Sequence, residues 1–331
     1  MSGASLSPKT PALTAGRLLE RMRDTLQLSQ VEGTGALERV ITSPNVSSPG
    51  LVLAGYTERF PGHRVQVLGE TEVTYLNTRD AGERDRVLQM FFAHAIPCVF
   101  VTKGLEPPLG MVEAARAAGV PVLKSALKTN EFYTRIKPWL EDEFAPTISL
   151  HGSLSDVFGV GLLFMGRSGI GKSECVLDLV ERGHRLVADD LVFAKRRGTD
   201  VLIGSGHEMQ RHCMEIRGVG LVDVPAIFGV RAVRQQKRIE VVVQLEEWHQ
   251  DMPVDRTGLD GETTTVLGVD LPKITVPLNP GKNITVVAEV IAMNHLLKYS
   301  GFDPAERFNE RLIGRMRAAT DVKRYLQQDD E

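Results

Sequence analysis

Apolar residues recur at helical spacing in several stretches of the first half of the chain, and short apolar runs separate these stretches. Helical spacing predicts amphipathic helices, and the short runs between them predict strands. In chain order we expect a helix over Ala15–Leu28, a helix over Arg84–Ala95, a strand over Cys98–Thr102, a helix over Leu109–Ala118, a strand over Val120–Leu123 and a helix over Thr129–Glu143. Helices that alternate with strands in this way are typical of an α/β domain with a parallel sheet.

The pattern changes at Ala145-Pro146, where the proline ends the preceding helix and short strands begin. The elements expected beyond it are strands over Thr147–Leu150, Leu154–Phe158, Gly161–Met165 and Lys237–Leu245, and helices over Asn283–Tyr299 and Pro304–Met316. A chain of 331 residues exceeds the usual size of one hydrophobic core, so two domains are expected. We therefore divide the chain into an N-terminal α/β domain over residues 1–144, with either a regulatory or an assembly role, and a second domain over residues 145–331.

Composition and charge narrow the class of protein without changing this organisation. Hydrophobic residues make up 42% of the chain and charged residues 24%, as in ordinary globular proteins. The formal net charge of -3 supplies no overall positive field of the kind that nucleic acid demands, so we expect no nucleic-acid partner. The chain has 3 cysteines without a CxxC pair, no apolar core of a signal peptide, and no apolar run long enough to span a bilayer. These observations predict a cytoplasmic protein without disulfides and without a membrane segment.

The clearest motif follows the predicted strand Gly161–Met165 and matches the GxxxxGK(S/T) pattern in full. Its glycines let backbone N–H groups approach phosphate oxygens, and the helix that begins near Lys172 directs its positive end at the same anion. The Lys172 ammonium suits the β- and γ-phosphates, and the Ser173 hydroxyl can ligate Mg²⁺. The motif therefore predicts a P-loop that binds a nucleotide or pyrophosphate. Its residues are Gly166, Arg167, Ser168, Gly169, Ile170, Gly171, Lys172 and Ser173.

Two carboxylates, Asp189 and Asp190, end a short apolar run that comes one helix after this motif. An aspartate at a strand end beside a P-loop can hold Mg²⁺, directly or through water, or can accept a proton from an incoming hydroxyl. Adjacent side chains on a strand point to opposite faces, so the two carboxylates are expected to have different tasks. A solvated turn with two aspartates is the alternative interpretation. The pair follows the motif sooner than in Ras-like NTPases, which predicts a different P-loop architecture.

Other candidate residues each have a structural alternative. Glu215 and Arg217 alternate with apolar neighbours and are expected on one face of a strand, either as an ion pair or as part of a site. His151 comes just before the buried strand and is either a structural or a functional histidine. Arg256 lies on a predicted loop, where it is either solvated or stabilises a transferring phosphoryl group. The turn over Pro277–Asn283 enters a helix and is either a capped loop or a site for free phosphate.

The ordered set of these motifs resembles the HPr kinase/phosphorylase family, a bacterial family of bifunctional enzymes. The parts that carry the resemblance are His151-Gly152, the glycine motif Gly166–Ser173, Val187-Ala188-Asp189-Asp190, Glu215-Ile216-Arg217-Gly218, Asp255-Arg256 and Pro277–Asn283. They cover about residues 145–315, and the N-terminal half is compatible with the family's first domain. The resemblance implies an N-terminal α/β domain, a C-terminal P-loop kinase domain whose core is similar to that of phosphoenolpyruvate carboxykinase, and a homohexamer.

The resemblance also implies an activity in the regulation of carbon metabolism. The enzyme would phosphorylate a serine of HPr or of a related phosphocarrier protein, with Mg²⁺ and with ATP or pyrophosphate as donor. In reverse, inorganic phosphate would attack the phosphoserine and release pyrophosphate. The implied catalytic residues are His151, Lys172, Asp190 and Arg256, and the implied metal ligands are Ser173 and Glu215. Asp190 would be the base in the kinase direction and, when protonated, the acid in the reverse direction.

Three further parts of the implied site are Asp189, Arg217 and the turn that would serve mainly the reverse reaction. The residues of this turn are Pro277, Leu278, Asn279, Pro280, Gly281 and Lys282. Here the chain departs from the family's PxRPGR-like form, since Asn279 and Lys282 stand in place of arginines. A lysine keeps one positive charge but lacks the bidentate fork of arginine.

Two other classes of function compete with this interpretation. A small-molecule kinase or ATPase could use the same P-loop, and it would turn over ATP without a protein acceptor. A regulatory module that senses nucleotide without chemistry is the second alternative, and it would bind ATP tightly without transfer. The intact set of Lys172, Ser173 and Asp190 favours catalysis over sensing.

Overall fold

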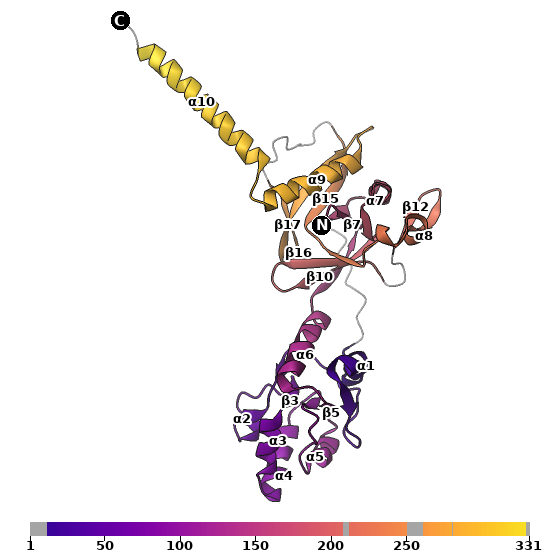
Figure 1. Cartoon of the computed structure of the whole chain (residues 1–331), viewed down its shortest axis with the longest axis vertical. Helices are drawn as coiled ribbons and strands as arrows, with labels where there is room; N and C mark the ends of the chain where they lie inside the picture. The colour runs from indigo at the N-terminus through magenta and orange to yellow at the C-terminus, as the bar shows by residue number, and fades with distance from the viewer. Residues whose placement is uncertain (1–11, 208–211, 250–260, 280, 329–331) are drawn as a thin grey trace. The chain divides into compact units, whose positions relative to one another are not determined.

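We describe the fold from a computed structural model of the chain, which describes residues 12–207, 212–249, 261–279 and 281–328. The chain forms two compact units (Figure 1). The N-terminal unit ends at Ala145, and the C-terminal unit begins at Pro146. Each unit has its own sheets and its own hydrophobic core, so each is described by itself below.

The N-terminal unit contains a five-stranded sheet with the strand order β1-β5-β4-β3-β2. Strands β2 to β5 are parallel, and β1 pairs antiparallel with β5. The strands are β1 (Leu28–Gln30), β2 (Val46–Ser47), β3 (Val65–Leu68), β4 (Val99–Val101) and β5 (Val122–Ser125). The helices are α1 (Ala15–Leu26), α2 (Gly50–Leu53), α3 (Glu70–Asn77), α4 (Ala81–Phe92), α5 (Met111–Ala118) and α6 (Thr129–Glu143). The predicted α/β domain with a parallel sheet is confirmed.

Two hydrophobic clusters cover the two faces of this sheet. One cluster joins strand residues to α2, α3, α4 and α5, with Leu76 and Phe91 fully buried in it. The other joins strand residues to α1 and α6, with Leu18 and Phe132 fully buried. The alternation of the strands explains this division, because successive side chains of a strand point to opposite faces. Helices therefore lie on both faces of the sheet, as in doubly wound α/β folds.

The C-terminal unit contains two larger sheets and one hairpin. The strands are β6 (Thr147–His151), β7 (Ser153–Val157), β8 (Val160–Met165), β9 (Arg185–Ala188), β10 (Leu191–Arg197), β11 (Val201–Ser205), β12 (Cys213–Ile216), β13 (Gly220–Asp223), β14 (Gln236–Arg238), β15 (Val241–Glu247), β16 (Thr263–Val266) and β17 (Val269–Leu278). The helices are α7 (Lys172–Glu181), α8 (Val224–Phe228), α9 (Ile284–Tyr299) and α10 (Pro304–Gln328), with a 3₁₀ turn at Val230–Ala232.

The central sheet of this unit has the order β16-β17-β15-β8-β7-β9, and β8, β15 and β17 are parallel. Helices α7 and α9 pack on one of its faces through a shared cluster that includes Val176 and Ile291 (Figure 1). The second sheet, β14-β11-β10-β6, packs on the other face, where Leu154 and Leu163 meet Val192. None of the helices in the described part of the chain combines the length and the hydropathy that a membrane span requires.

The structure corrects two expectations about elements in this unit. The run Lys237–Leu245 is two strands in different sheets, because the chain crosses from one sheet to the other at Ile239-Glu240. There the Ile239 N–H donates to Leu202 and the Glu240 N–H donates to Gly161. No glycine or proline separates the two strands in the sequence, so spacing alone could not show the crossing. The helix that begins at Pro304 continues beyond Met316 to Gln328.

A cluster of polar and charged side chains, of which only His184 is buried, holds α9 against the end of α7. The Glu289 carboxylate of α9 accepts hydrogen bonds from Arg182 Nε at 2.9 Å and Nη2 at 2.6 Å. It also lies 3.0 Å from His184 Nε2, whose ring packs edge-on against Phe158. The hydrogen bonds from Arg182 are the main cause that lowers the pKa of Glu289 to about 2. Because α7 begins at the glycine motif, this cluster fixes the helix that presents the motif.

We predict that Glu289→Gln lowers the free energy of unfolding at pH 7 by about 1–2 kcal/mol, since the charged partner of a bidentate pair is lost. The folded-state pKa of Glu289 lies below its unfolded value, so its contribution is complete above about pH 5 and disappears as the pH falls toward 2. Urea unfolding at pH 7 and near pH 2.5 measures this. The control Glu181→Gln, at an exposed position of α7, should show no such dependence. An equal loss at both pH values would contradict the prediction.

Candidate active site

The glycine motif, Gly166–Ser173, comprises the loop that follows β8 and the first two residues of α7, and we call it the glycine loop. Gly166, Gly169 and Gly171 all have positive φ angles, of 149°, 77° and 101°. A Cβ on Gly166 would lie 2.7 Å from the carbonyl oxygen of Leu245. Only glycine combines these angles with so close an approach. The expected strand, loop and helix order of a phosphate-binding loop is therefore present, although its phosphate role stays a prediction.

The Lys172 ammonium folds over the glycine loop. Its Nζ donates to the carbonyl oxygens of Gly166 and Arg167, at 3.1 Å each. Lys172 is half-buried at the first position of α7, where the unpaired N–H groups of a helix create a positive end. The ammonium, the helix start and the loop amides thus concentrate positive charge at one place.

Asp189 connects this loop to the end of β9. Ser173 Oγ donates to Asp189 Oδ1 at 3.0 Å, and Ser153 Oγ donates to the same oxygen at 2.5 Å. Antiparallel pairing of β7 with β9 brings Ser153 opposite Asp189. Burial raises the pKa of Asp189, and the hydrogen bonds from the two serines oppose that rise. The Asp189 carboxylate is therefore a half-buried acceptor directly beside the start of α7.

Asp190 has the opposite environment. It is exposed and has a φ angle of 62°, in the left-handed region that few residues other than glycine adopt. Its carbonyl oxygen accepts from the Gly152 N–H at 3.1 Å, and Leu191 pairs in register with the exposed His151 at the end of β6. β9 ends at Ala188, so the separation of the two carboxylates comes from this strained turn and not from strand alternation. His151 and Asp190 consequently belong to adjacent backbone segments.

The hairpin of β12 and β13 brings a second cation to the glycine loop. The sequence predicted that Arg217 shares a strand face with Glu215. This is wrong, because β12 ends at Ile216 and Arg217 lies in the turn that follows. The two terminal nitrogens of Arg217 lie 2.6 Å from the place that a Cβ on Gly169 would take. Glu215 is exposed on β12, across from Leu221. The structure thus brings Arg217 to the glycine loop, while it gives Glu215 no described contact with Ser173.

The end of β17 leads into the predicted phosphate turn. Lys282 Nζ donates to the Pro277 carbonyl oxygen at 3.1 Å, and Asn283 caps α9 by accepting from the Val286 N–H. Leu278 pairs in register with Glu247 of β15, which forms an ion pair with Arg167 of the glycine loop. A pocket of about 220 Å³ lies between this end of β15 and the loop. Two expected site residues, Arg256 and Pro280, lie outside the described residues.

One edge of the central sheet collects all of these segments. β8, β15 and β17 are parallel, so their carboxyl ends reach the same edge. β7 is antiparallel to both β8 and β9, so β9 also ends there. Open α/β sheets bind their ligands at the carboxyl ends of parallel strands. The glycine loop, the Asp189-Asp190 turn and the end of β17 therefore lie where such a fold places its ligand.

Two family profiles cover almost all of the described chain. The profile described as HPr Serine kinase N terminus matches residues 13–140, and the one described as HPr Serine kinase C-terminal domain matches residues 142–312. The chain belongs to the HPr serine kinase family. It is accordingly an enzyme, a phosphotransferase, with the two-domain α/β organisation of that family.

Two relatives that match most of the chain agree with this assignment to the HPr serine kinase family. The HPr kinase/phosphorylase of Chloroherpeton thalassium is 44% identical over 306 residues, which are 92% of this chain and 90% of the relative. That of Bacillus licheniformis is 44% identical over 289 residues, 87% of this chain and 93% of the relative. The solved structure of the Hpr(Ser) kinase/phosphatase from Coxiella burnetii is 34% identical and covers 46% of this chain and 98% of its own, with a TM-score of 0.43.

The residues of this family member fit a magnesium ion that is bound together with phosphate. Among the described residues, no group of three or more His, Cys, Asp or Glu is placed to hold a metal. Mg²⁺ does not need such a group, since it usually takes one or two protein oxygens and completes its shell with water and phosphate oxygens. Ser173 and Asp189 supply a hydroxyl and a carboxylate that already lie 3.0 Å apart. The donor set therefore matches Mg²⁺ better than zinc, which prefers nitrogen and sulfur.

Ser153 is the site residue that the sequence did not reveal. It lies 36 positions before Asp189 and forms the shorter of the two serine hydrogen bonds to that carboxylate. No spacing rule connects the two positions, because their contact depends on the pairing of β7 with β9. The one available signal was the polar pair Ser153 and Ser155 in a strand whose residues are all buried.

We predict that Ser153→Ala raises the pKa of Asp189 further, because it removes a hydrogen bond that favours the ionised form. A ¹³C NMR titration of the carboxyl group measures this shift. Ser155→Ala is the matched control, since Ser155 donates to the Arg185 carbonyl oxygen and not to Asp189. If both variants titrate like the unmodified protein, Ser153 does not act on Asp189.

Proposed function

We propose that this chain phosphorylates a serine of HPr, or of a related phosphocarrier protein, in a Mg²⁺-dependent reaction with ATP or pyrophosphate as donor. The same site runs the reverse phosphorolysis, in which inorganic phosphate attacks phosphoserine and pyrophosphate is released. The observation that carries the proposal is the hydrogen bond of Ser173 to Asp189, which joins the glycine loop to the two-carboxylate turn. Relatives over most of the chain are HPr kinase/phosphorylases, which supports the choice of HPr and a role in carbon metabolism.

The donor phosphates would lie on the glycine loop. Loop N–H groups and the start of α7 would bind their oxygens, as at other helix N-termini. Lys172 Nζ would leave the Gly166 and Arg167 carbonyls and bind the β- and γ-phosphates. Arg217, which lies against Gly169, would add a second positive group. Arg256 belongs to the proposed cations only by family resemblance.

Ser173 and Asp189 would hold the magnesium ion, and Glu215 stays a candidate ligand from the resemblance alone. When bound, Mg²⁺ neutralises charge that develops on the phosphates. Asp189 suits this position because a divalent cation stabilises its ionised form against the burial that raises its pKa. Ser153 would keep the carboxylate oriented toward the loop.

Asp190 would handle the serine proton. In the kinase direction its carboxylate accepts the proton as the serine oxygen attacks the terminal phosphorus and the bond to the leaving oxygen breaks. In the reverse direction a phosphate oxygen attacks the phosphoserine phosphorus, the serine oxygen leaves, and Asp190 returns the proton to it. Exposure of Asp190 leaves it accessible to a protein substrate, and the neighbouring segment of His151 supports a shared role in proton transfer.

The Pro277–Lys282 turn would bind inorganic phosphate in the reverse reaction. Lys282 Nζ donates to the Pro277 carbonyl oxygen and would turn from it to the phosphate. It would bind the phosphate as a single point charge, without the bidentate geometry of arginine. A P-loop core similar to phosphoenolpyruvate carboxykinase and a hexameric assembly complete the proposal from the resemblance. The sparse cysteines support a cytoplasmic location. Two alternatives come from the sequence, an ATPase without a protein acceptor and a non-catalytic nucleotide sensor, and the phosphotransferase relatives disfavour both.

One assay distinguishes these functions. The purified chain is mixed with HPr, Mg²⁺ and ATP, and phosphoserine is detected by mass spectrometry. Excess inorganic phosphate is then added, and pyrophosphate is measured. Phosphoserine that disappears as pyrophosphate forms supports the proposal. Brisk ATP turnover that HPr does not affect indicates the ATPase, and ATP binding without any transfer indicates the sensor.

We predict that Lys172→Ala lowers the turnover number by about a hundredfold or more in both directions, as other losses of a transition-state electrostatic contact do. Single-turnover kinetics with HPr measures the effect. Near-normal rates in both directions would remove the glycine loop from the proposed site.

We predict that Asp190→Asn abolishes phosphorylation of the serine but leaves nucleotide affinity largely unchanged, because the amide cannot accept the proton. Isothermal titration calorimetry gives the affinity, and phosphoserine formation gives the rate. Asp200→Asn, at an exposed turn after β10, is the control. A parallel loss of affinity and rate would indicate that Asp190 is a metal ligand or a structural residue.

A further inference from the structure

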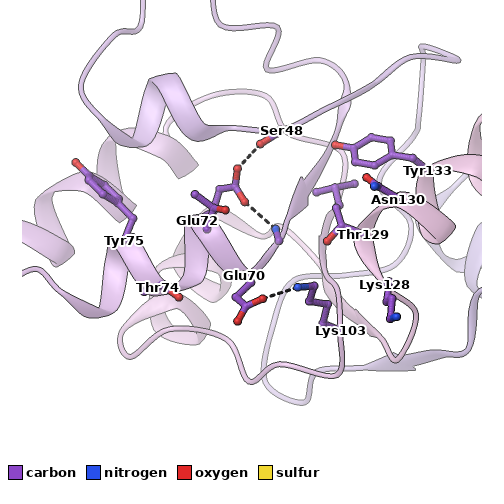
Figure 2. Close-up of a pocket in the computed structure, with 13 residues that line it drawn as sticks. Ser48, Glu70, Glu72, Thr74, Tyr75, Lys103, Lys128, Thr129, Asn130 and Tyr133 are labelled. Atoms are coloured by element: carbon purple, nitrogen blue, oxygen red, sulfur yellow. Dashed lines mark hydrogen bonds and ion pairs between the residues drawn. The ribbon is translucent and has the colours of Figure 1, made fainter.

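The N-terminal domain contains a pocket of about 860 Å³ that the proposed reaction does not use (Figure 2). It lies at the carboxyl edge of the parallel strands: Ser48 follows β2, Gly69 follows β3 and Lys103 comes shortly after β4. Lys128 and Thr129 follow β5. This volume falls in the upper part of the usual range for small-molecule sites.

The course of the chain creates this pocket. After β3 the chain enters α3, whose buried residues belong to one face of the sheet. After β5 it enters α6, whose buried residues belong to the other face. β4 lies between β3 and β5 and leaves its carboxyl end open between the two helix starts. A crevice where neighbouring connections leave to opposite faces is the usual ligand site of an open α/β sheet.

The two helix starts lie close together across the crevice. A Cβ on Gly69 would lie 3.0 Å from Thr129 Oγ1, so a larger residue would crowd the start of α6. Thr129 Oγ1 itself lies 2.8 Å from Thr102 Oγ1 at the end of β4. Figure 2 shows Thr129, Asn130 and Tyr133 of α6 along one side and Glu70, Thr74 and Tyr75 of α3 along the other.

The acidic side chains of the pocket are already engaged. Glu70 pairs with Lys103, and Glu72 accepts from the Gly69 N–H at 2.9 Å and from Ser48 Oγ at 2.5 Å (Figure 2). Neither carboxylate needs a ligand to satisfy it. Lys103 likewise has its charge matched by Glu70.

The groups that remain include three hydrogen-bond donors: the ammonium of the exposed Lys128, the start of α6 and the hydroxyl of Tyr133. Lys128 makes no ion pair with any residue that the structure describes, and no side chain caps the start of α6 that it precedes. Burial, together with the charge of Glu72, raises the pKa of Tyr133 to about 12, so its hydroxyl keeps its proton at neutral pH. An uncompensated ammonium, a helix start and a phenol hydroxyl together favour an anion.

We propose that this pocket binds a phosphate monoester of a small organic molecule. The phosphate lies against Lys128 and the start of α6, and the organic part lies toward the rings of Tyr75 and Tyr133. The volume exceeds what free phosphate needs, so the site suits an esterified phosphate rather than the inorganic ion. The proposal goes beyond the phosphotransfer reaction and does not depend on the glycine loop, which belongs to the other domain.

The test uses the full chain labelled with 3-fluorotyrosine, because 2 of the pocket residues are tyrosines and the chain has 5 in all. Tyr75→Phe and Tyr133→Phe assign the ¹⁹F resonances. Inorganic phosphate, ribose 5-phosphate, AMP and uncharged adenosine are titrated separately. We expect both phosphate esters to shift the Tyr133 resonance, with inorganic phosphate weaker and adenosine without effect. If AMP shifts the Tyr133 resonance more than ribose 5-phosphate does, the part of the pocket near the tyrosines binds an aromatic base. If the two esters give equal shifts, the pocket recognises the phosphate and the sugar.

Variants separate this site from the glycine loop. Lys128→Ala should weaken the ester affinity about tenfold, the usual effect of losing one charged hydrogen bond. Lys137→Ala removes the same charge from an exposed position of the same helix, outside the pocket lining, and should leave the affinity unchanged. Lys172→Ala should also leave the Tyr133 response unchanged, even if it abolishes phosphotransfer. A Tyr133 resonance that no ester shifts, or a response that survives Lys128→Ala at full affinity, would overturn the proposal.

Discussion

The C-terminal domain depends on one shared acceptor, the Asp189 carboxylate oxygen that receives hydrogen bonds from both Ser173 and Ser153. Ser173 belongs to the helix that begins at the glycine loop, and Ser153 belongs to β7 next to β8. The carboxylate therefore ties the helix start, the central sheet and the end of β9 together. Burial of a carboxylate costs free energy unless such donors or a cation compensate it. The two serines supply that compensation in the chain itself.

The two consecutive aspartates therefore have carboxylates in opposite environments. Asp189 is half-buried and hydrogen-bonded, with a raised pKa, while Asp190 is exposed on a turn with a positive φ angle. Paired carboxylates with different environments are how enzymes assign different tasks to the same functional group. The strained turn at Asp190 is what separates them, because it directs one side chain inward and leaves the other accessible.

The same topological rule operates in both domains. In each, parallel strands bring the segments after them to one edge of a sheet, and donors gather there. In the C-terminal domain the edge holds the glycine loop and the two aspartates. In the N-terminal domain it holds Lys128 and the start of α6 beside a large pocket. The first edge holds the residues of the proposed phosphotransfer site, and the second carries a separate proposal.

The sequence by itself predicted several local elements and the strand, loop and helix order around the glycine motif. Thr129–Glu143 was predicted with the bounds that the structure has, because its helical spacing is regular and Ala145-Pro146 stops it. The glycine motif could be recognised because it is defined by residue types at fixed short spacing. Tertiary structure alone decided which distant residues meet. Ser153 contacts Asp189, and Arg217 reaches Gly169, only because strand pairing and a hairpin bring them together. Lys237–Leu245 divides between two sheets for the same reason, since hydrophobic spacing records burial but not the identity of the partner.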